Sequence, residues 1–275
     1  MDIIKAALLG LIQGVTEFLP VSSSGHLAVF GRNEEFLNLY LIVMLHIGTF
    51  FSIVVYYRRD VAELIRGGLR LLVALPMLVR DRAGFTSFIR TDVGARLALL
   101  VAVGTIPTGL IGLGLKSVAE YSASPGNTKI VGAFFIITGI LMYLCDRFPA
   151  GAKAIGQGGA KDAIMVGVFQ GIAALPGLSR SGLTVFAATM RGFERRDAAK
   201  FSFLMALPAL LGAALLELRE GGGRLAPLPT LVGAAVAFVA GYFSLSLLVR
   251  LLASRKLRYF TGYLAALGLL VLLFM

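Results

Sequence analysis

GLIQGVTEFLPVSSSGH, residues 10–26, recurs in altered form as GVFQGIAALPGLSRSGLT, residues 167–184. Both stretches begin with a glycine, a glutamine and a second glycine in the same spacing, and both continue to a proline and a serine–glycine pair. Their ionisable residues differ, because the first stretch carries Glu17 and His26 and the second carries Arg180. A duplicated segment with one acid/base copy and one cationic copy predicts a site formed between two repeats.

The composition of the chain is that of an integral membrane protein. Hydrophobic residues make up 57% of it and charged residues 15%, against about 45–50% and about 25% in soluble domains. The long apolar runs predict an all-α, multi-pass membrane protein rather than a β-barrel with alternating segments of about ten residues. The net charge of +11 predicts basic loops on the cytoplasmic side, and we expect no nucleic acid as a partner. The single cysteine, Cys145, excludes an internal disulfide bond.

Six apolar stretches are long enough to cross a bilayer, which takes about 17–25 residues. They lie near 38–57, 95–115, 130–147, 199–217, 229–250 and 258–274. The two motif stretches are shorter apolar runs, each broken by proline and a serine–glycine cluster and followed by a second short run. We predict that each forms a re-entrant helical hairpin, because irregular backbone at membrane depth is tolerated only inside protein or beside a wet cavity.

The basic residues predict the orientation of these segments. If the long loop 58–94 is cytoplasmic, nineteen basic residues lie on the inner side of the membrane, as the positive-inside rule requires. The outer side then holds six: Lys5, Arg32, Lys116, Lys129, Arg219 and Arg224. The loop 58–94 is expected to carry an amphipathic piece on the inner leaflet, with a short helix packed on the bundle as the alternative.

Each hairpin is followed by three spans, and three is an odd number. The second unit is therefore inserted upside down relative to the first. We predict a single membrane domain built from two inverted-topology repeats, residues 1–147 and 162–275, which is an architecture typical of transporters. In this arrangement the first hairpin enters from the outer side, so the site is expected to open to the periplasmic or extracellular face.

Glu17 is the main chemical candidate of the first stretch. An ionisable side chain inside an apolar segment is costly and is a functional candidate by default. Gln13 lies four residues earlier, on the same face of a helix. The plainer alternative is that Glu17 and Arg180 pair only to neutralise each other.

Hydroxyl groups surround the ionisable residues of both stretches. His26 follows Ser22, Ser23 and Ser24, and a hydroxyl beside an imidazole can form an activated nucleophile, although serines also cap helices. In the second stretch, glycines and the start of a half-helix provide backbone N–H groups for an anion, and Arg180 adds a planar fork. His46 lies within a span, where a structural hydrogen bond is expected. The sequence has none of the motifs of transition-metal or nucleotide sites.

QGVTEFLPVSSSGH and PGLSRSG closely resemble the two signature motifs of the undecaprenyl-diphosphate phosphatase family, the bacterial membrane enzymes linked to bacitracin resistance. The first family motif is an E/Q-x-x-x-E pair followed by P-V-S-S-x-G-H, and the second is P-G-x-S-R-S-x-x-T. The resemblance covers essentially the whole chain. It implies an enzyme of the bacterial inner (plasma) membrane that removes the terminal phosphate of undecaprenyl pyrophosphate and so recycles the lipid carrier for peptidoglycan synthesis.

The resemblance also implies roles for individual residues. Glu17 would be the essential second acid, Ser23 the nucleophile or a phosphate ligand, His26 the acid/base and Arg180 the phosphate anchor. The substrate-binding residues would be Gln13, Ser22, Ser24, Gly177, Ser179, Ser181 and Thr184. A divalent metal, magnesium or calcium, would assist. Gln13 stands where the commonest pattern has glutamate, which leaves Glu17 and the pyrophosphate oxygens as the metal ligands.

Two other functions are consistent with the same residues. A transporter or flippase would carry a polyprenyl phosphate across the membrane without cleaving a bond, with Arg180 holding the headgroup. A membrane scaffold is the third possibility, but it gives no reason for Glu17 and Arg180 to occur together. The expected partners are the polyprenyl pyrophosphate lipid and membrane lipid, with a homodimer left open, and the sequence does not decide between Ser23 and water as the nucleophile.

Overall fold

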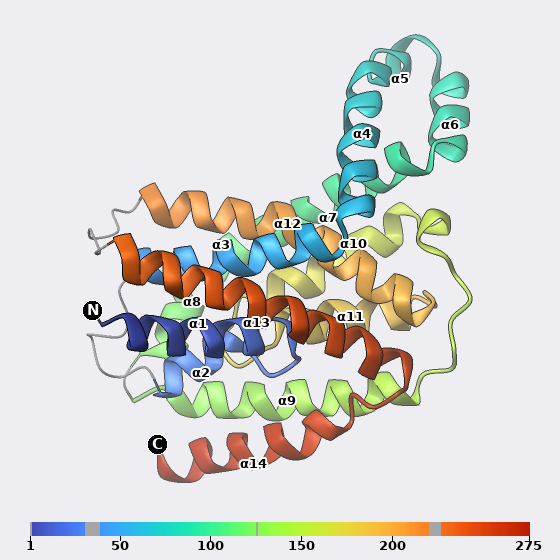
Figure 1. Ribbon diagram of the computed structural model, residues 1–275. Coiled ribbons are helices and arrows are strands. Elements are labelled where there is room, and N and C mark those ends of the chain that lie inside the picture. Colours follow the sequence, from blue (N-terminus) through green and yellow to red (C-terminus); the bar gives the residue numbers. More distant parts are fainter. Residues whose placement is uncertain (1, 31–38, 125, 220–226) are drawn as a thin grey trace.

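The computed structural model describes residues 2–30, 39–124, 126–219 and 227–275, and their regular structure is helical (Figure 1). The helices are α1 (Ile3–Phe18), α2 (Ser23–Phe30), α3 (Leu39–Tyr56), α4 (Arg58–Ala74), α5 (Met77–Arg80), α6 (Arg82–Thr91), α7 (Val93–Gly114), α8 (Lys116–Ala123), α9 (Thr128–Arg147), α10 (Ala160–Ile172), α11 (Arg180–Met190), α12 (Arg195–Arg219), α13 (Pro227–Ala253) and α14 (Tyr259–Phe274). Arg32, Arg224 and position 38, the start of the first expected span, lie outside the described residues.

The helices confirm an all-helical integral membrane protein. Within the described ranges, four helices are long and apolar enough to cross a bilayer: α7, α9, α12 and α13. The pair α3 and α4, which is bent by 90°, would make a fifth if it is one span, and α14 is a shorter apolar helix. Large apolar side chains such as Leu110, Phe243 and Phe274 are exposed on these helices, as expected where a helix surface faces lipid tails.

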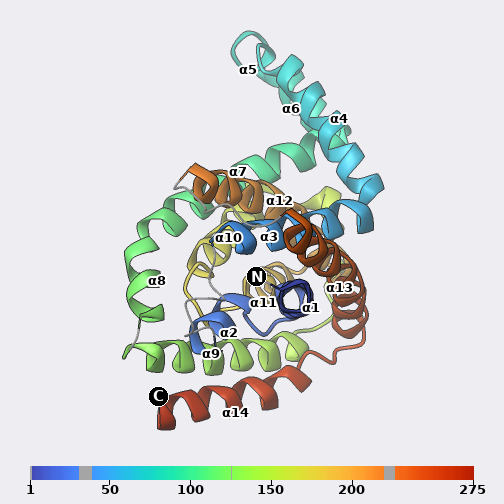
Figure 2. The same ribbon diagram turned by 60° about the vertical axis from the view of Figure 1, so that its left-hand side comes forward.

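The two motif stretches meet at the centre of the bundle. Figure 2 shows α1, α2, α10 and α11 enclosed by α7, α8, α9, α12 and α13, with α14 outside against α9. Motif glycines allow this close packing. A Cβ atom on Gly10 would lie 2.3 Å from the carbonyl oxygen of Gly233 in α13, and one on Gly167 would lie 2.1 Å from that of Gly104 in α7. The first helix of each stretch therefore packs on a long helix, α1 on α13 and α10 on α7.

Residues 58–91 form an arm of three helices, α4 to α6, that projects from one end of the bundle (Figure 1). The inner face of α4 packs against the start of α7, where a Cβ atom on Gly67 would lie 2.0 Å from the carbonyl carbon of Gly94. Arg70 donates hydrogen bonds to both carboxylate oxygens of Asp92, at 2.6 and 2.9 Å, and holds the pKa of Asp92 below its usual value. Only α4 thus packs on the bundle in this way, and its outer face exposes apolar side chains such as Leu69.

Candidate active site

The first stretch forms a helix, a tight turn and a second helix. α1 ends at Phe18, and α2 begins at Ser23. Gln13 and Glu17 lie one turn apart on the buried face of α1, and Gln13 Nε2 donates a hydrogen bond to Glu17 Oε2 at 2.9 Å. Between the helices, Ser22 adopts a left-handed backbone conformation with φ of 64°, which is uncommon for a residue other than glycine.

The second stretch has the same design. α10 ends at Ile172, and α11 begins at Arg180 after a turn that contains Gly177. Gly177 has φ of 97°, and a Cβ atom there would lie 2.6 Å from the carbonyl oxygen of Val131, so this position requires glycine. Ser179 caps α11, because its Oγ accepts a hydrogen bond from the backbone N–H of Gly182 at 3.2 Å.

The two turns lock together through backbone and hydroxyl groups. The backbone N–H of Gly177 donates to Ser22 Oγ at 3.0 Å, and that of Gly25 donates to the same oxygen at 3.2 Å. Gly25 itself lies so close that a Cβ atom on it would be 2.8 Å from the backbone nitrogen of Gly177. Ser22 is therefore the joint between two segments that are about 150 residues apart in the chain.

Glu17 is the centre of the polar contacts at this joint. Ser23 Oγ donates to Glu17 Oε2 at 2.8 Å, and Arg180 Nη2 donates to Glu17 Oε1. His46 Nε2 lies 3.8 Å from Glu17 Oε2. The buried Nη1 of Arg180 has no hydrogen-bond partner among the described residues. Because buried polar atoms are nearly always paired, the unpaired guanidinium nitrogen of Arg180 points to an anionic partner that the protein itself does not supply.

A polar pocket opens beside this cluster. Its lining residues come from both stretches: Thr16, Glu17, Ser22, Ser23, Ser24, Ala173, Leu178, Ser179 and Arg180. Most of its exposed surface is polar. The pocket brings a carboxylate, a hydroxyl bonded to it and a cation together, which is an arrangement suited to transfer of a phosphoryl group.

Several predicted site residues lie beside the pocket rather than in its lining. Gln13 supports Glu17, and Gly177 supports Ser22, as described above. Ser181 Oγ lies 3.1 Å from Ser179 Oγ. The fully buried Thr184 shares a hydrogen bond with Ser202 of α12 at 2.5 Å. These residues hold the turns and α11 in place.

Both ring nitrogens of His26 have hydrogen-bond partners other than Ser23. Its Nδ1 is 2.8 Å from the carbonyl oxygen of Ser22, and its Nε2 is 2.6 Å from the hydroxyl of Tyr263 in α14. The structure thus brings Ser23 to Glu17, and places the two ring nitrogens of His26 against Ser22 and Tyr263.

Three residues at or near the site are absent from the sequence-based site prediction. Thr16 lines the pocket. Its position between Gln13 and Glu17 in the motif is the feature of the sequence that identifies it as a candidate. His46 makes the expected structural hydrogen bond, from Nδ1 to the carbonyl oxygen of Ile42 at 2.8 Å, but also faces Glu17. Nothing in the local sequence distinguishes Tyr263 from the other aromatic residues of the last helix.

Known proteins resemble this chain along nearly its whole length. A family model described as "Bacitracin resistance protein BacA" matches residues 6–270. Proteins named undecaprenyl-diphosphatase from Carboxydothermus hydrogenoformans, Alkaliphilus metalliredigens and Desulfosudis oleivorans are 39%, 37% and 38% identical to it. These matches cover 99%, 100% and 98% of this chain and 97%, 99% and 97% of the relatives. The chain therefore belongs to the family of bacitracin resistance protein BacA.

Proposed function

We propose that this protein is a membrane phosphatase that hydrolyses undecaprenyl pyrophosphate to undecaprenyl phosphate and inorganic phosphate. The observation that carries the proposal is the Ser23 hydroxyl, bonded to Glu17 at 2.8 Å, in a pocket that is also lined by Arg180, whose Nη1 has no partner among the described residues. These are a nucleophile, its base and a phosphate-binding cation. Relatives named undecaprenyl-diphosphatase support the same activity, which would recycle the lipid carrier for cell-wall synthesis.

The geometry supports a mechanism in two steps. Arg180 and the N-terminal end of α11 hold the terminal phosphate, because both favour an anion. Ser23 Oγ attacks the terminal phosphorus as its proton passes to Glu17, the bond to the bridging oxygen breaks, and the proton goes to the departing undecaprenyl phosphate. Water then attacks the phosphorus of the phosphoserine, the bond to Ser23 Oγ breaks, inorganic phosphate leaves, and Glu17 transfers a proton from that water back to Ser23. The acid/base role that the resemblance implies for His26 remains a prediction.

A divalent metal, Mg²⁺ or Ca²⁺, fits this pocket only together with the substrate. Among the described residues, no group of three or more His, Cys, Asp or Glu side chains is placed to hold a metal ion. Glu17 and the pyrophosphate oxygens would be its ligands, since these cations prefer oxygen. The metal would supply further neutralisation of the phosphate charge.

Phosphate release by the purified protein distinguishes an enzyme from a carrier. We expect the protein in detergent, with no membrane gradient, to release inorganic phosphate from undecaprenyl pyrophosphate over many turnovers. A carrier moves the lipid without cleaving it, so the absence of released phosphate from folded protein supplied with Mg²⁺ or Ca²⁺ would contradict the proposed activity.

The helix contacts support six spans, two re-entrant hairpins and inverted repeats. The three spans of the first repeat are α3, α7 and α9, and those of the second are α12, α13 and α14. The hairpin of each repeat packs on the second span of the other repeat, since α1 packs on α13 and α10 on α7. The first spans, α3 and α12, contact each other, as do the third spans, α9 and α14. The chain ends lie at one end of the bundle and the α4–α6 arm at the other (Figure 1). This arrangement fits a cytoplasmic arm and a site that opens to the periplasmic or extracellular side.

Cysteine labelling of intact cells tests this orientation. In a Cys145→Ser background, we expect Lys129→Cys, at the start of α9, to react with a membrane-impermeant thiol reagent added outside. Ser87→Cys, on the exposed side of α6, should react only after the membrane is permeabilised. The opposite labelling pattern would place the arm outside and the site on the cytoplasmic face.

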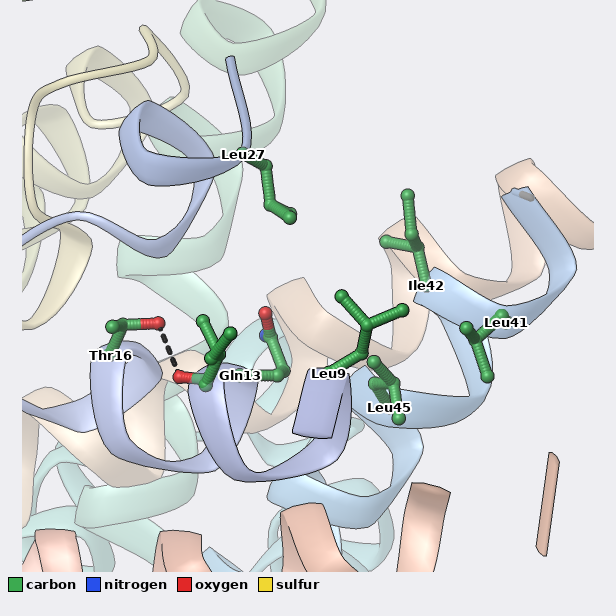
Figure 3. A pocket seen from close by; sticks show the side chains of 8 residues that line it. Leu9, Gln13, Thr16, Leu27, Leu41, Ile42 and Leu45 are labelled. Carbon is green, nitrogen blue, oxygen red and sulfur yellow. Dashed lines mark hydrogen bonds between the residues drawn. The ribbon is translucent and has the colours of Figure 1, made fainter. Parts of the chain in front are cut away.

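The lipid tail requires an apolar path that leads out of the polar pocket. A small apolar cleft between α1, α2 and α3 marks where this path would begin (Figure 3). It is lined by Leu9, Ile12, Gln13, Thr16, Leu27, Leu41, Ile42 and Leu45. Thr16 lines both this cleft and the polar pocket, so the two are adjacent. A second, larger apolar groove between α1 and α13 reaches Leu19 but shares no lining residue with the pocket.

Filling the cleft should weaken binding of the long-chain substrate. Ile12 lines the cleft and is exposed, so Ile12→Trp can fill it without disturbing the core. We expect the KM for undecaprenyl pyrophosphate to rise about tenfold, the equivalent of losing contact with about two methylene groups, while kcat stays close to that of the wild type. The matched control is Val239→Trp in the larger groove, and a rise in KM for this variant alone would move the tail to that groove.

A further inference from the structure

Tyr263 connects an outer helix to the motif that holds the nucleophile. It belongs to α14, which packs on α9 at the outside of the bundle (Figure 2). Its hydroxyl lies 2.6 Å from His26 Nε2, although the two residues are 237 positions apart in the chain. The two rings are nearly parallel, at 7°, and Phe135 forms a T-shaped pair with the imidazole, with ring centroids 5.3 Å apart. The imidazole is thus held on several sides.

The hydrogen bonds of His26 define which nitrogen carries the proton. A backbone carbonyl oxygen only accepts hydrogen bonds, so Nδ1, at 2.8 Å from the Ser22 oxygen, must be the N–H donor. In a neutral imidazole Nε2 then has a lone pair, and it accepts a hydrogen bond from the Tyr263 hydroxyl. The Tyr263 hydroxyl therefore favours the tautomer that lets His26 hold Ser22.

Ser22 needs to be held, because its backbone is strained. Its φ of 64° lies in the left-handed region, and such a conformation persists only where its surroundings impose it. The Ser22 carbonyl oxygen accepts from His26 Nδ1 at 2.8 Å and from the His26 backbone N–H at 3.2 Å. The next residue is Ser23, so the orientation of the Ser22 peptide directs the Ser23 side chain toward Glu17.

We propose that Tyr263 is a positioning residue, which holds His26 in the tautomer and orientation that fix the Ser22 turn and so aim Ser23 at Glu17 and the substrate phosphate. The kinetic part of the proposal rests on the phosphatase function proposed above. It gives His26 a positioning role in place of the acid/base role that the resemblance implies. The helix α14 would then contribute to the reaction without touching the substrate.

Nitrogen-15 NMR of the imidazoles tests the contact independently of activity. The chain has only two histidines, so a His46→Gln variant of the protein labelled with ¹⁵N-histidine leaves the signals of His26 alone. We expect the Nδ1–H tautomer, with an Nε2 resonance that shifts in Tyr263→Phe and not in the matched control Tyr259→Phe, which changes an exposed tyrosine of the same helix. The Nε2–H tautomer, or no shift in Tyr263→Phe, would overturn the proposal whatever the protein's activity.

Kinetics then separate positioning from acid/base chemistry. Tyr263→Phe keeps the stacked ring and loses one hydrogen bond, so kcat should fall about tenfold with KM unchanged. His26→Asn retains a side-chain N–H near the position of Nδ1, and should keep most of the activity that His26→Ala loses, with the pH–rate profile of the wild type. Tyr259→Phe should behave as the wild type.

An acid/base role for His26 predicts a different kinetic result. If His26 is the acid/base, His26→Asn and His26→Ala should lose activity equally, by about 10²–10⁴-fold, and Tyr263→Phe should shift the pH–rate profile by changing the basicity of the imidazole. That pattern would overturn the positioning role. A wild-type protein that releases no phosphate would instead contradict the proposed function, and the NMR result would still decide whether Tyr263 sets the His26 tautomer.

Discussion

Arg180→Lys should lower kcat for phosphate release by about 10²-fold or more, nearly as much as Arg180→Ala, as is typical when a charge-stabilising group is lost. In the structure one guanidinium nitrogen, Nη2, donates to Glu17, while the buried Nη1 has no protein partner among the described residues. Arginine can thus bind Glu17 and a phosphate oxygen with one planar group, whereas a lysine ammonium is a point charge on a flexible stem. The measurement is turnover of the purified variants at saturating substrate.

The matched control for this prediction is Arg191→Lys. Arg191 follows the other end of α11 and donates to Asp162 at 2.6 Å, away from the pocket. Its replacement should leave kcat unchanged. Turnover of Arg180→Lys close to that of the wild type would contradict the forked contact and leave Arg180 as a general source of positive charge.

Glu17→Gln should lower kcat by about 10²–10⁴-fold, the range for loss of a general base. Glutamine is nearly the same size and can still accept a hydrogen bond from Ser23, but it cannot take the serine proton. Measuring kcat together with the thermal unfolding temperature separates chemistry from folding, because the change also leaves the partly buried Arg180 guanidinium without its counter-charge.

Glu63→Gln provides the control for loss of a carboxylate. Glu63 pairs with Arg70 in the α4 arm at 2.7 Å, so its replacement should leave turnover as in the wild type. If Glu17→Gln folds normally and keeps kcat within tenfold of the wild type, Glu17 is only a counter-ion for Arg180, and the proposed base is wrong.

The sequence predicts most of the helical framework, because length and apolar composition determine which segments can cross a bilayer. The all-helical membrane class is confirmed, and the expected spans 95–115 and 130–147 correspond to α7 (Val93–Gly114) and α9 (Thr128–Arg147). The start of α12 is less well predicted. This helix begins at Arg195, four residues before the expected span 199–217, because its first turn is polar and hydropathy detects only the apolar part.

The candidate site is predictable where its residues lie within the duplicated motifs. Opposite charges in two matching stretches indicate that Glu17 and Arg180 meet, and the structure places them in contact. Residues contributed by other helices are not predictable in this way. His46 and Tyr263 reach the motifs only through the packing of α3 and α14, and their own sequence surroundings are ordinary apolar spans. The spacing of Ser23 and His26 likewise gives no indication that the imidazole contacts Ser22 and Tyr263.

Ser23, activated by Glu17, is expected to form a covalent phosphoserine during turnover. The most direct measurement is an acid quench of a single turnover, with enzyme in excess over undecaprenyl pyrophosphate, followed by mass spectrometry of the peptide that contains Ser23. We expect phosphate on Ser23 in the wild type, and neither phosphopeptide nor turnover in Ser23→Ala. An unmodified Ser23 peptide throughout the turnover, together with measurable phosphate release by Ser23→Ala, would contradict the claim and assign the attack to water.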